Sequence, residues 1–393
     1  MTLPLTGVTV VSLEQAVAAP FATRQLADLG ARVIKVERPG AGDFARGYDE
    51  SIQGQSSYFV WLNRSKESLT CNLKNPDGVA LVQQLLANAD VFVQNLAPGA
   101  AARLGLSSEE LRARYPQLVV CDVSGYGSSG PWAGLKAYDL LVQCEAGLVS
   151  LTGTPDEPAK VGISVADIAA GMYAYSGILT ALLQRTSTGQ GATVEVSLFE
   201  SLTEWLGSPA YYTEGSGKQP PRVGMEHATI APYGPYTVGD GSVMLLAIQN
   251  EREWRSFCAT VLAAPDVAAD ERFSRNSARV AHRRELNAII SARLAELDEA
   301  TAVELLQRAD VAHARVNQVR GMLDHPVLAG RDRWRTVDTP GGPVRALVPP
   351  ATLRGSEPRM DPVPTVGEHT GAILSSLGMD PQEIARLREA GAV

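Results

Sequence analysis

The sequence predicts an α/β fold with an open, mainly parallel sheet and a second, smaller α+β region. Short apolar runs of strand length alternate with helix-length segments through the first 200 residues or so. The chain has 393 residues, more than the roughly 250–300 at which a single core usually stops growing. Beyond Gly224 the pattern changes to a hairpin followed by polar helices. Together these three observations favour two domains.

The first repeat of the α/β pattern lies at the amino-terminal end. Residues 8–13 form an apolar run typical of a buried strand, and residues 20–29 have the pattern of a helix that ends at Gly30. Residues 31–37 then predict a second strand. A strand, helix and strand in this order form a βαβ unit, so the two strands are expected to be parallel.

The same alternation continues to about residue 207. The later apolar runs predict strands, and the amphipathic segments between them predict helices that cover the faces of the sheet. The expected strands are residues 91–94, 118–123 and 193–197, and the expected helices are residues 77–88, 107–115, 166–185 and a last one ending near 207.

The second region begins after a segment, residues 215–224, that is rich in Gly, Pro and Gln and is typical of a linker or mobile loop. Residues 236–246 predict a hairpin that turns at Gly-Asp-Gly, and polar helices follow between about 251 and 310. After Pro326 the chain is strand- and proline-rich and ends in an amphipathic helix at 381–390. We expect domain limits of 1–214, 215–325 and 326–393.

Composition limits the classes of partner. A net charge of −8 does not support general attraction to nucleic acids or anionic membranes, so an anionic ligand needs local cations. The four cysteines are far apart and form no CxxC pair, which favours a reducing, cytoplasmic setting. The amino terminus lacks a signal-peptide pattern, and no run of about 18 apolar residues predicts a membrane span.

Asp167 is the first chemical candidate. It lies among small residues in residues 162–171, at a predicted junction between a loop and a helix. Aspartate is a preferred helix cap, so one interpretation is structural. The other is that the small neighbours admit a bulky substrate to a carboxylate that the helix amino terminus favours. The local sequence leaves both interpretations open.

Cationic residues near predicted strand ends are the second candidates. Arg38, Lys74 and Arg103 lie where ligands of open α/β sheets collect, although solvated surface charge is the commoner explanation for any one of them. Residues 40–45 match the loose dinucleotide pattern GxGxxA. That pattern follows the second strand instead of the first, so nicotinamide or flavin binding is not favoured.

His227 lies just past the Gly-rich segment, where it either contacts a substrate or belongs to the ordinary surface. The other four histidines are scattered and have no metal-ligand spacing. The sequence therefore gives no support for metal catalysis.

Read in order, several short motifs make nearly the whole chain resemble the class III coenzyme A (CoA) transferases, the family that includes formyl-CoA transferase and the α-methylacyl-CoA racemases. The motifs that carry the resemblance are residues 5–8, 19–22, 26–40, 63–66, 93–99, 125–127, 138–139 and 367–370, together with Asp167 and Gly171.

The resemblance implies a Rossmann-like large domain, a smaller domain, and a carboxyl-terminal segment that returns to the large one. It also implies a homodimer of two interlocked rings. Acyl-CoA would be a substrate, with no permanently bound cofactor, and a small carboxylic acid would be the other substrate. The CoA-binding positions of the family match Gln15, Ala16, Arg38, Lys74, Asn95, Leu96, Arg103 and Lys136.

By the same resemblance, Asp167 is the nucleophilic aspartate that carries the acyl group and CoA in turn. Tyr138 would line the thioester site. The racemase branch carries histidine and aspartate where Ala137, Tyr138 and Asp139 stand here. Since a phenol is a poor acid or base at neutral pH, the transferase is favoured over the racemase. A CoA-binding protein without catalysis is the third alternative.

Residues 12–20 and 224–233 resemble transferases of C4 to C6 dicarboxylates more than formyl-CoA transferase. This resemblance implies succinyl-CoA as donor and an acid such as mesaconate, itaconate, citramalate or glutarate as acceptor. A distal carboxylate needs a polar partner, and His227, Arg46 and Arg64 are the candidates.

Overall fold

The computed structural model describes residues 2–393; Met1, the first residue of the expected large domain, lies outside them. The chain divides into two compact units. The first contains the residues up to Leu148, then Val161–Ser208 and Ala329–Val393, and the second contains Val149–Lys160 and Pro209–Leu328. Unit 2 thus includes residues 149–160, a short segment that precedes the expected limit at 214.

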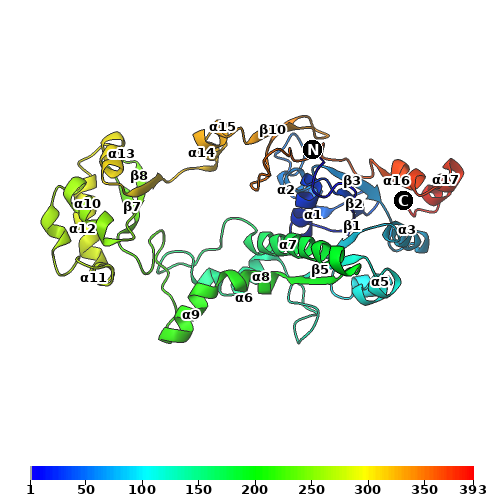
Figure 1. Ribbon diagram of the computed structural model, residues 1–393, viewed down its shortest axis with the longest axis horizontal. Coiled ribbons are helices and arrows are strands. Elements are labelled where there is room, and N and C mark those ends of the chain that lie inside the picture. Colours follow the sequence, from blue (N-terminus) through cyan, green and yellow to red (C-terminus); the bar gives the residue numbers. More distant parts are fainter. Residues whose placement is uncertain (1) are drawn as a thin grey trace. The chain divides into compact units, whose positions relative to one another are not determined.

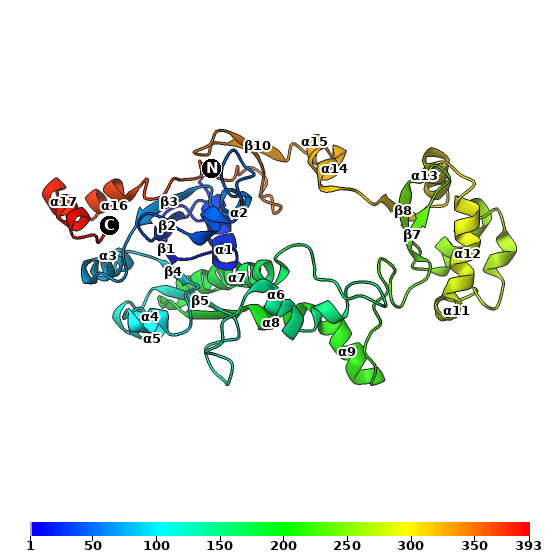
Figure 2. The same ribbon diagram turned by 180° about the vertical axis from the view of Figure 1, so that it is seen from behind.

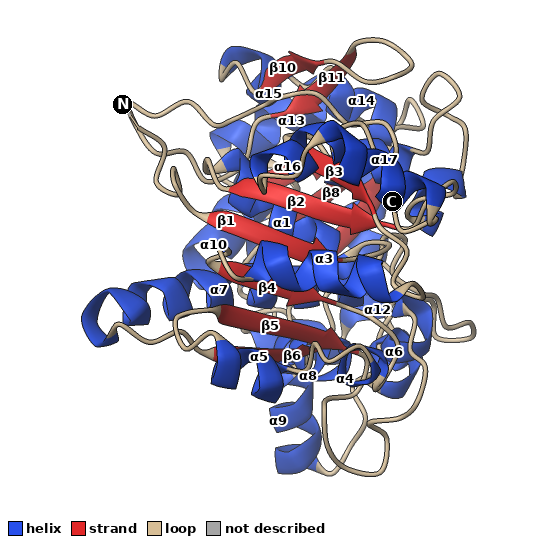
Figure 3. Cartoon of the chain, turned by 90° about the vertical axis from the view of Figure 1, so that its right-hand side faces the viewer, coloured by secondary structure: helices blue, strands red, loops and turns tan. Residues whose placement is uncertain are grey.

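The first unit is built on a six-stranded sheet whose adjacent strands are all parallel, as predicted (Figure 3). Its order is β3-β2-β1-β4-β5-β6, so the order reverses between β1 and β4. At such a reversal a crevice opens beyond the carboxyl ends of the strands. The strands are β1 (Thr9–Leu13), β2 (Arg32–Glu37), β3 (Lys66–Thr70), β4 (Val91–Gln94), β5 (Val119–Ser124) and β6 (Thr193–Ser197).

Successive strand residues face opposite sides of the sheet, and each side has its own apolar core. Val10 and Val33 pack on one side with α1, α6, α7 and α8, whereas Val11 and Ile34 pack on the other with α3, α5, α16 and α17. The first layer comprises α1 (Ala18–Asp28), α6 (Asp139–Glu145), α7 (Val165–Thr188) and α8 (Leu198–Trp205), and the second includes α3 (Pro76–Leu86), α4 (Ala100–Arg103), α5 (Ser108–Arg114), α16 (Thr370–Ser376) and α17 (Pro381–Glu389).

Helix α7 is the long helix of the first layer and runs beside the sheet (Figure 1). By length and composition alone it could cross a membrane. Its small residues Ala166, Ala170 and Ala174 are nevertheless fully buried, and a core helix meets the same criteria. This face packs against α1 in the apolar core of the first layer.

The carboxyl-terminal segment lies against the first unit. Thr370 Oγ1 at the start of α16 accepts a 3.0 Å hydrogen bond from the backbone of Thr70 in β3. The Asn72 backbone N–H donates to the Ala392 carbonyl at 2.8 Å, just beyond α17. Ahead of α16 the same segment forms an antiparallel hairpin of β10 (Trp334–Val337) and β11 (Val344–Leu347). Smaller elements of the first unit are η1 (Phe44–Gly47) and α2 (Ser57–Leu62).

The second unit has its own core around Trp254, Phe257 and Ile290. The predicted hairpin is confirmed: β7 (Tyr233–Thr237) and β8 (Val243–Ala247) pair antiparallel, and Gly241 in the turn has φ +87°. β9 (Ala312–Arg315) adds a third strand (Figure 2). The helices from here on are α10 (Glu251–Thr260), α11 (Asn276–Ala281), α12 (Arg283–Leu294), α13 (Glu299–Arg308) and α14 (Val319–Leu323).

Three further elements cross the limits between the units. They are η2 (Leu148–Ser150), α9 (Gly207–Ser216) and α15 (Pro326–Gly330). Helix α9 covers the first two residues of the segment that was expected to be a linker, so the loop starts only at Gly217.

Candidate active site

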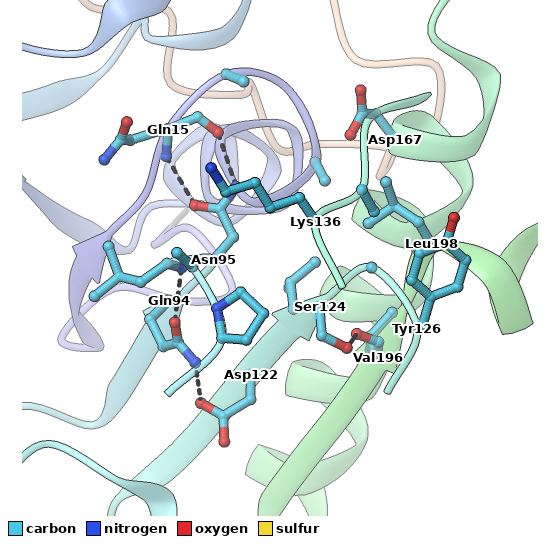
Figure 4. A pocket seen from close by; sticks show the side chains of 18 of the residues that line it. Gln15, Gln94, Asn95, Asp122, Ser124, Tyr126, Lys136, Asp167, Val196 and Leu198 are labelled. Atoms are coloured by element: carbon cyan, nitrogen blue, oxygen red, sulfur yellow. Dashed lines mark hydrogen bonds between the residues drawn. The ribbon is translucent and has the colours of Figure 1, made fainter. Parts of the chain in front are cut away.

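One side chain, Asn95, joins the two loops that border the crevice where the strand order reverses. Asn95, which follows β4, accepts a 2.8 Å hydrogen bond from the Gln15 backbone N–H and donates another of 2.8 Å to the Gln15 carbonyl (Figure 4). Gln15 follows β1. This pair of bonds ties the two loops together, so the backbone on both sides of the crevice has a fixed position.

A cavity of about 1410 Å³ opens beyond the carboxyl ends of β1, β4, β5 and β6. Both of its walls come from the first unit. The structure brings seven of the eleven sequence-predicted site residues to this cavity, as Figure 4 shows for several of them. The seven are Gln15, Ala16, Asn95, Leu96, Lys136, Tyr138 and Asp167.

Asp167 is the third residue of α7, but it does not cap the helix. Asp139, at the start of α6, takes that role: its Oδ1 accepts hydrogen bonds from the backbone N–H groups of Ala166 at 2.7 Å and Asp167 at 3.3 Å. Among residues 2–393 no donor is bonded to the Asp167 carboxylate. The structural interpretation of Asp167 therefore fails, and its oxygens are available to a ligand in the cavity.

Burial raises the pKa of Asp167 to about 7, and the neighbouring negative charge of Asp139 adds to the effect. Both causes penalise the ionised form. When it is ionised, the Asp167 carboxylate is consequently a better nucleophile than that of an ordinary aspartate, because basicity and nucleophilicity rise together.

A buried cluster of charged side chains stabilises the loop after β1. Lys35 in β2 contacts Asp43 at 2.8 Å and Glu14 at 3.3 Å, and Lys66 in β3 contacts Glu14 at 2.6 Å. All four side chains are buried, so the charges depend on one another. Asp43 also accepts a 3.2 Å hydrogen bond from the backbone of Ala16, which has the unusual φ of +63°. The cluster thus holds a left-handed residue at the cavity wall.

Two predicted cations lie at a smaller hollow of about 180 Å³ beyond β1 and β2. Arg38 and Lys74 line it, and it shares Gln15 and Leu96 with the main cavity. Both cations are exposed. The predicted Arg103, at the end of α4, is also exposed but lines neither hollow.

The three residues proposed to bind the distal carboxylate of the substrate do not line the main cavity. Arg64 is buried and makes two 2.8 Å bonds to Asp28, and Arg46 makes bonds of 2.9 and 2.8 Å to Glu37. Since both guanidinium groups already hold a carboxylate, neither is free for a substrate. His227 belongs to the second unit, where its ring stacks on Tyr233.

Sequence reasoning missed two residues beside Asp167. Asp139 was noted only as part of a motif, although its spacing before an apolar helix is typical of a first-turn acid. Tyr48 also lines the cavity, and burial with the nearby charges of Asp43 and Asp167 raises its pKa to about 12. No local signal marks Tyr48, because the fold alone brings it to the cavity and within the electrostatic influence of Asp167.

A metal centre finds no support in the arrangement of ligating side chains. Within residues 2–393, no three His, Cys, Asp or Glu side chains gather in a geometry that could hold a metal ion.

Comparison with known proteins identifies relatives along the whole chain. A family model described as CoA-transferase family III matches residues 5–370. A succinate–glutarate CoA-transferase of Agrobacterium fabrum is 34% identical over 95% of this chain and 96% of its own. The succinyl-CoA:glutarate CoA-transferase of Mus musculus is also 34% identical, over 99% of this chain and 90% of its own. The crystal structure of a CAIB/BAIF family protein from Brucella suis has a TM-score of 0.84 and 35% identity, covering 96% of this chain and 100% of that one.

Proposed function

This chain is an enzyme that belongs to CoA-transferase family III, and from that premise we propose that it moves CoA from succinyl-CoA to a small dicarboxylic acid with Asp167 as the covalent carrier. Enzymes of this family act on CoA thioesters. The observation that carries the proposal is the Asp167 carboxylate, which lines a cavity of about 1410 Å³ while Asp139 makes the helix-capping bonds.

The proposed reaction has four balanced steps. An Asp167 oxygen attacks the succinyl-CoA carbonyl, forming a mixed anhydride and releasing the CoA thiolate. The thiolate attacks the aspartyl carbonyl, so the anhydride breaks, succinate leaves, and Asp167 becomes a CoA thioester. The acceptor carboxylate then displaces CoA and forms a new anhydride. Finally the thiolate attacks the acceptor carbonyl and frees Asp167.

The proposed steps need protection from water and a binding site for CoA. Anhydride and thioester are both hydrolysed by water, so the carrier must work in a closed, largely dry site. We propose that Gln15, Ala16, Asn95, Leu96 and Lys136 bind CoA in the main cavity, with Arg38, Lys74 and Arg103 near its phosphates and Tyr138 at the thioester. His227 is proposed to contact the acid substrate.

Trapping the carrier tests the mechanism. Protein incubated with succinyl-CoA and quenched with hydroxylamine should carry an aspartyl hydroxamate at Asp167 by mass spectrometry. Asp167→Ala should lose turnover at least about a thousandfold, which is about 4 kcal/mol of barrier. Wild-type turnover in Asp167→Ala would reject the mechanism.

A panel of acids tests the substrate. Both relatives named above carry glutarate in their names, and the candidates are glutarate, mesaconate, itaconate and citramalate. We expect transfer from succinyl-CoA to at least one of them. Activity confined to monocarboxylates would contradict the dicarboxylate proposal but leave CoA transfer standing. Exchange of an α-proton without an acceptor acid would identify a racemase instead, and CoA binding without transfer a non-catalytic protein.

We further propose that the enzyme is a cytoplasmic homodimer with a three-part domain layout of residues 1–214, 215–325 and 326–393. Large apolar side chains stay exposed on α7, among them Met172, Tyr173 and Leu183. Leu183 has an exposed fraction of 70%. Such a face favours burial against a second copy. Light scattering of the purified protein should give twice the chain mass, and a monomer at micromolar concentration would contradict the dimer.

A further inference from the structure

Asp139 connects two helices at the edge of the cavity. Its Oδ1 accepts from two backbone N–H groups at the start of α7, and its Oδ2 accepts a 2.7 Å hydrogen bond from Gln143 Nε2. Gln143 is fully buried, and its Oε1 in turn accepts a 3.0 Å bond from the backbone of Val161. Both oxygens of Asp139 are therefore fixed, and so is the first turn of α7.

The backbone N–H groups in the first turn of α7 all have hydrogen-bond acceptors. The Val165 N–H bonds to the Ile163 carbonyl at 2.8 Å, and the Ile168 N–H bonds to the Ser164 carbonyl at 2.9 Å. With Ala166 and Asp167 bonded to Asp139, the first four N–H groups of the helix all have acceptors. A helix start normally stabilises a nearby carboxylate through such donors. Here the Asp139 carboxylate and two backbone carbonyls occupy them, and Asp167 gains none of that stabilisation.

From these contacts, and resting on the function proposed above, we propose that Asp139 is the positioning residue of the nucleophile: it anchors α7 and keeps a fixed negative charge beside Asp167, which leaves the Asp167 oxygens reactive. When Asp167 becomes an anhydride or a thioester it loses its charge, and the repulsion from Asp139 ends. The same fixed charge thus disfavours the free carboxylate relative to the acylated states and promotes the first attack.

Other ionisable groups share this region and must be distinguished from Asp139. Tyr48 has a pKa of about 12, so it stays neutral near pH 7. Phenols and ammonium groups ordinarily titrate near pH 10. The carboxylates lie on β5, β6 and α8, whereas the first turn of α1 carries no acid. The remaining groups that line the cavity are Lys136, Tyr138, Tyr58, Tyr126, Asp122, Glu195 and Glu200, and burial raises the pKa of Tyr126.

The test compares the pH dependence of kcat/KM in the wild type, Asp139→Asn and Glu145→Gln, with succinyl-CoA and the best acceptor. In the wild type the rate should rise with pH through about 7, as Asp167 ionises. Asp139→Asn removes the charge but keeps the Oδ1 acceptor. The acid limb of its pH profile, where the rate rises as Asp167 ionises, should therefore shift to lower pH by about one unit. It should not reach the pH at which an ordinary aspartate ionises, because burial is the larger cause of the raised pKa. Glu145→Gln removes an exposed charge from the same helix and should leave the limb unchanged.

A second variant separates charge from folding. In Asp139→Asn the new amide faces the Gln143 amide, so the protein loses a hydrogen bond and stability. Asp139→Asn with Gln143→Glu restores a donor–acceptor pair and moves the charge one side chain away from Asp167. The melting temperature should recover while the acid limb stays below that of the wild type.

The outcomes are distinct. An unshifted limb in both Asp139 variants, or a limb that Glu145→Gln shifts equally, would overturn the proposal. If Asp167→Ala keeps wild-type turnover, the carrier mechanism itself fails, whatever the Asp139 variants do.

Discussion

At the scale of single residues, Asp167 combines reactivity with a cost in stability. Its pKa is raised from 3.8 to about 7 in the folded protein. An unfolded chain holds the same carboxyl at an ordinary value, so the folded state binds more protons between pH 4 and 7. Ionised Asp167 therefore destabilises the fold, by an amount that grows as pH rises through that window and is constant above it.

Replacing the nucleophile should consequently stabilise the protein. We expect Asp167→Asn to unfold at a higher temperature than the wild type at pH 8, with a free energy of unfolding that is larger by at most about 4 kcal/mol. The difference should shrink to a small remainder near pH 4, where the carboxyl is protonated in the folded state and about half protonated in the unfolded state. Thermal melts of both proteins from pH 4 to pH 8 measure this. A constant difference across that range would mean that the charge of Asp167 is not the cause.

The role of Asp167 shows where local sequence reasoning ends. Its position at a helix start supported a capping role as well as a nucleophile, and the family resemblance favoured the nucleophile. In the structure the decision comes from Asp139, 28 residues earlier in the chain, which occupies the helix N–H groups. Only the tertiary contact between α6 and α7 reveals that the cap is supplied from elsewhere.

At the scale of elements, a single glycine controls how closely α1 and α7 approach. Gly171 lies one turn after Asp167, and a Cβ atom there would come within 2.7 Å of the Ala18 carbonyl and 3.0 Å of the Phe21 side chain. The contact is with backbone, so the helices would have to move apart. Because α1 starts directly after the Gln15 loop, this close approach also helps to bring that loop to the cavity that Asp167 lines.

We therefore expect Gly171→Ala to lower the free energy of unfolding by about 1–3 kcal/mol, as overpacked sites do. It should also lower kcat, since the first turn of α7 shifts relative to the cavity. Chemical denaturation and steady-state kinetics measure the two effects. Gly215→Ala in α9 is the control: nothing lies within 4 Å of its Cβ position, so it should be neutral or slightly stabilising. Equal effects of the two substitutions would contradict the argument.

The buried ionic cluster beneath the first loop gives a second prediction at this scale. Glu14→Ala leaves Lys35 and Lys66 without their shared carboxylate in the core, which should cost about 3–5 kcal/mol. The matched control is Glu67→Ala, which breaks a partly exposed pair with Arg32 between β2 and β3 and should cost at most about 1 kcal/mol. Urea denaturation compares the two. A Glu14 variant as stable as the Glu67 variant would show that the cluster adds nothing.

The same cluster explains why the sequence did not predict one strand of the parallel sheet. β1, β2, β4, β5 and β6 were expected from their apolar runs, and each observed strand lies within about two residues of its expected bounds. β3 was missed because Lys-Glu-Ser-Leu-Thr reads as a polar segment. Lys66 can be buried there because its ammonium group pairs with Glu14, 52 residues earlier, and donates two further hydrogen bonds.

At the scale of the whole molecule, the first unit depends on its last residues. Ile384, Leu387 and Ala392 complete the apolar core on the α3 and α5 face of the sheet. Deleting residues 380–393 should therefore destabilise that unit by on the order of 5 kcal/mol, since two large apolar side chains and their cover are lost. Melting followed by circular dichroism measures the loss.

The control for that deletion is Arg386→Ala. It breaks only the exposed pair of Arg386 with Asp77 on α3 and should change stability by less than about 1 kcal/mol. A truncated chain that melts with the wild type would show that α17 is dispensable.

The division of the chain into units also has a consequence for its synthesis. All six strands of the sheet are translated by Ser197, yet two of the helices that cover one of their apolar faces, α16 and α17, are the last to be made. Throughout translation of the second unit, the nascent sheet must keep part of that face uncovered. We expect the unfinished chain to be a client of ribosome-associated chaperones until Ala392 takes its place.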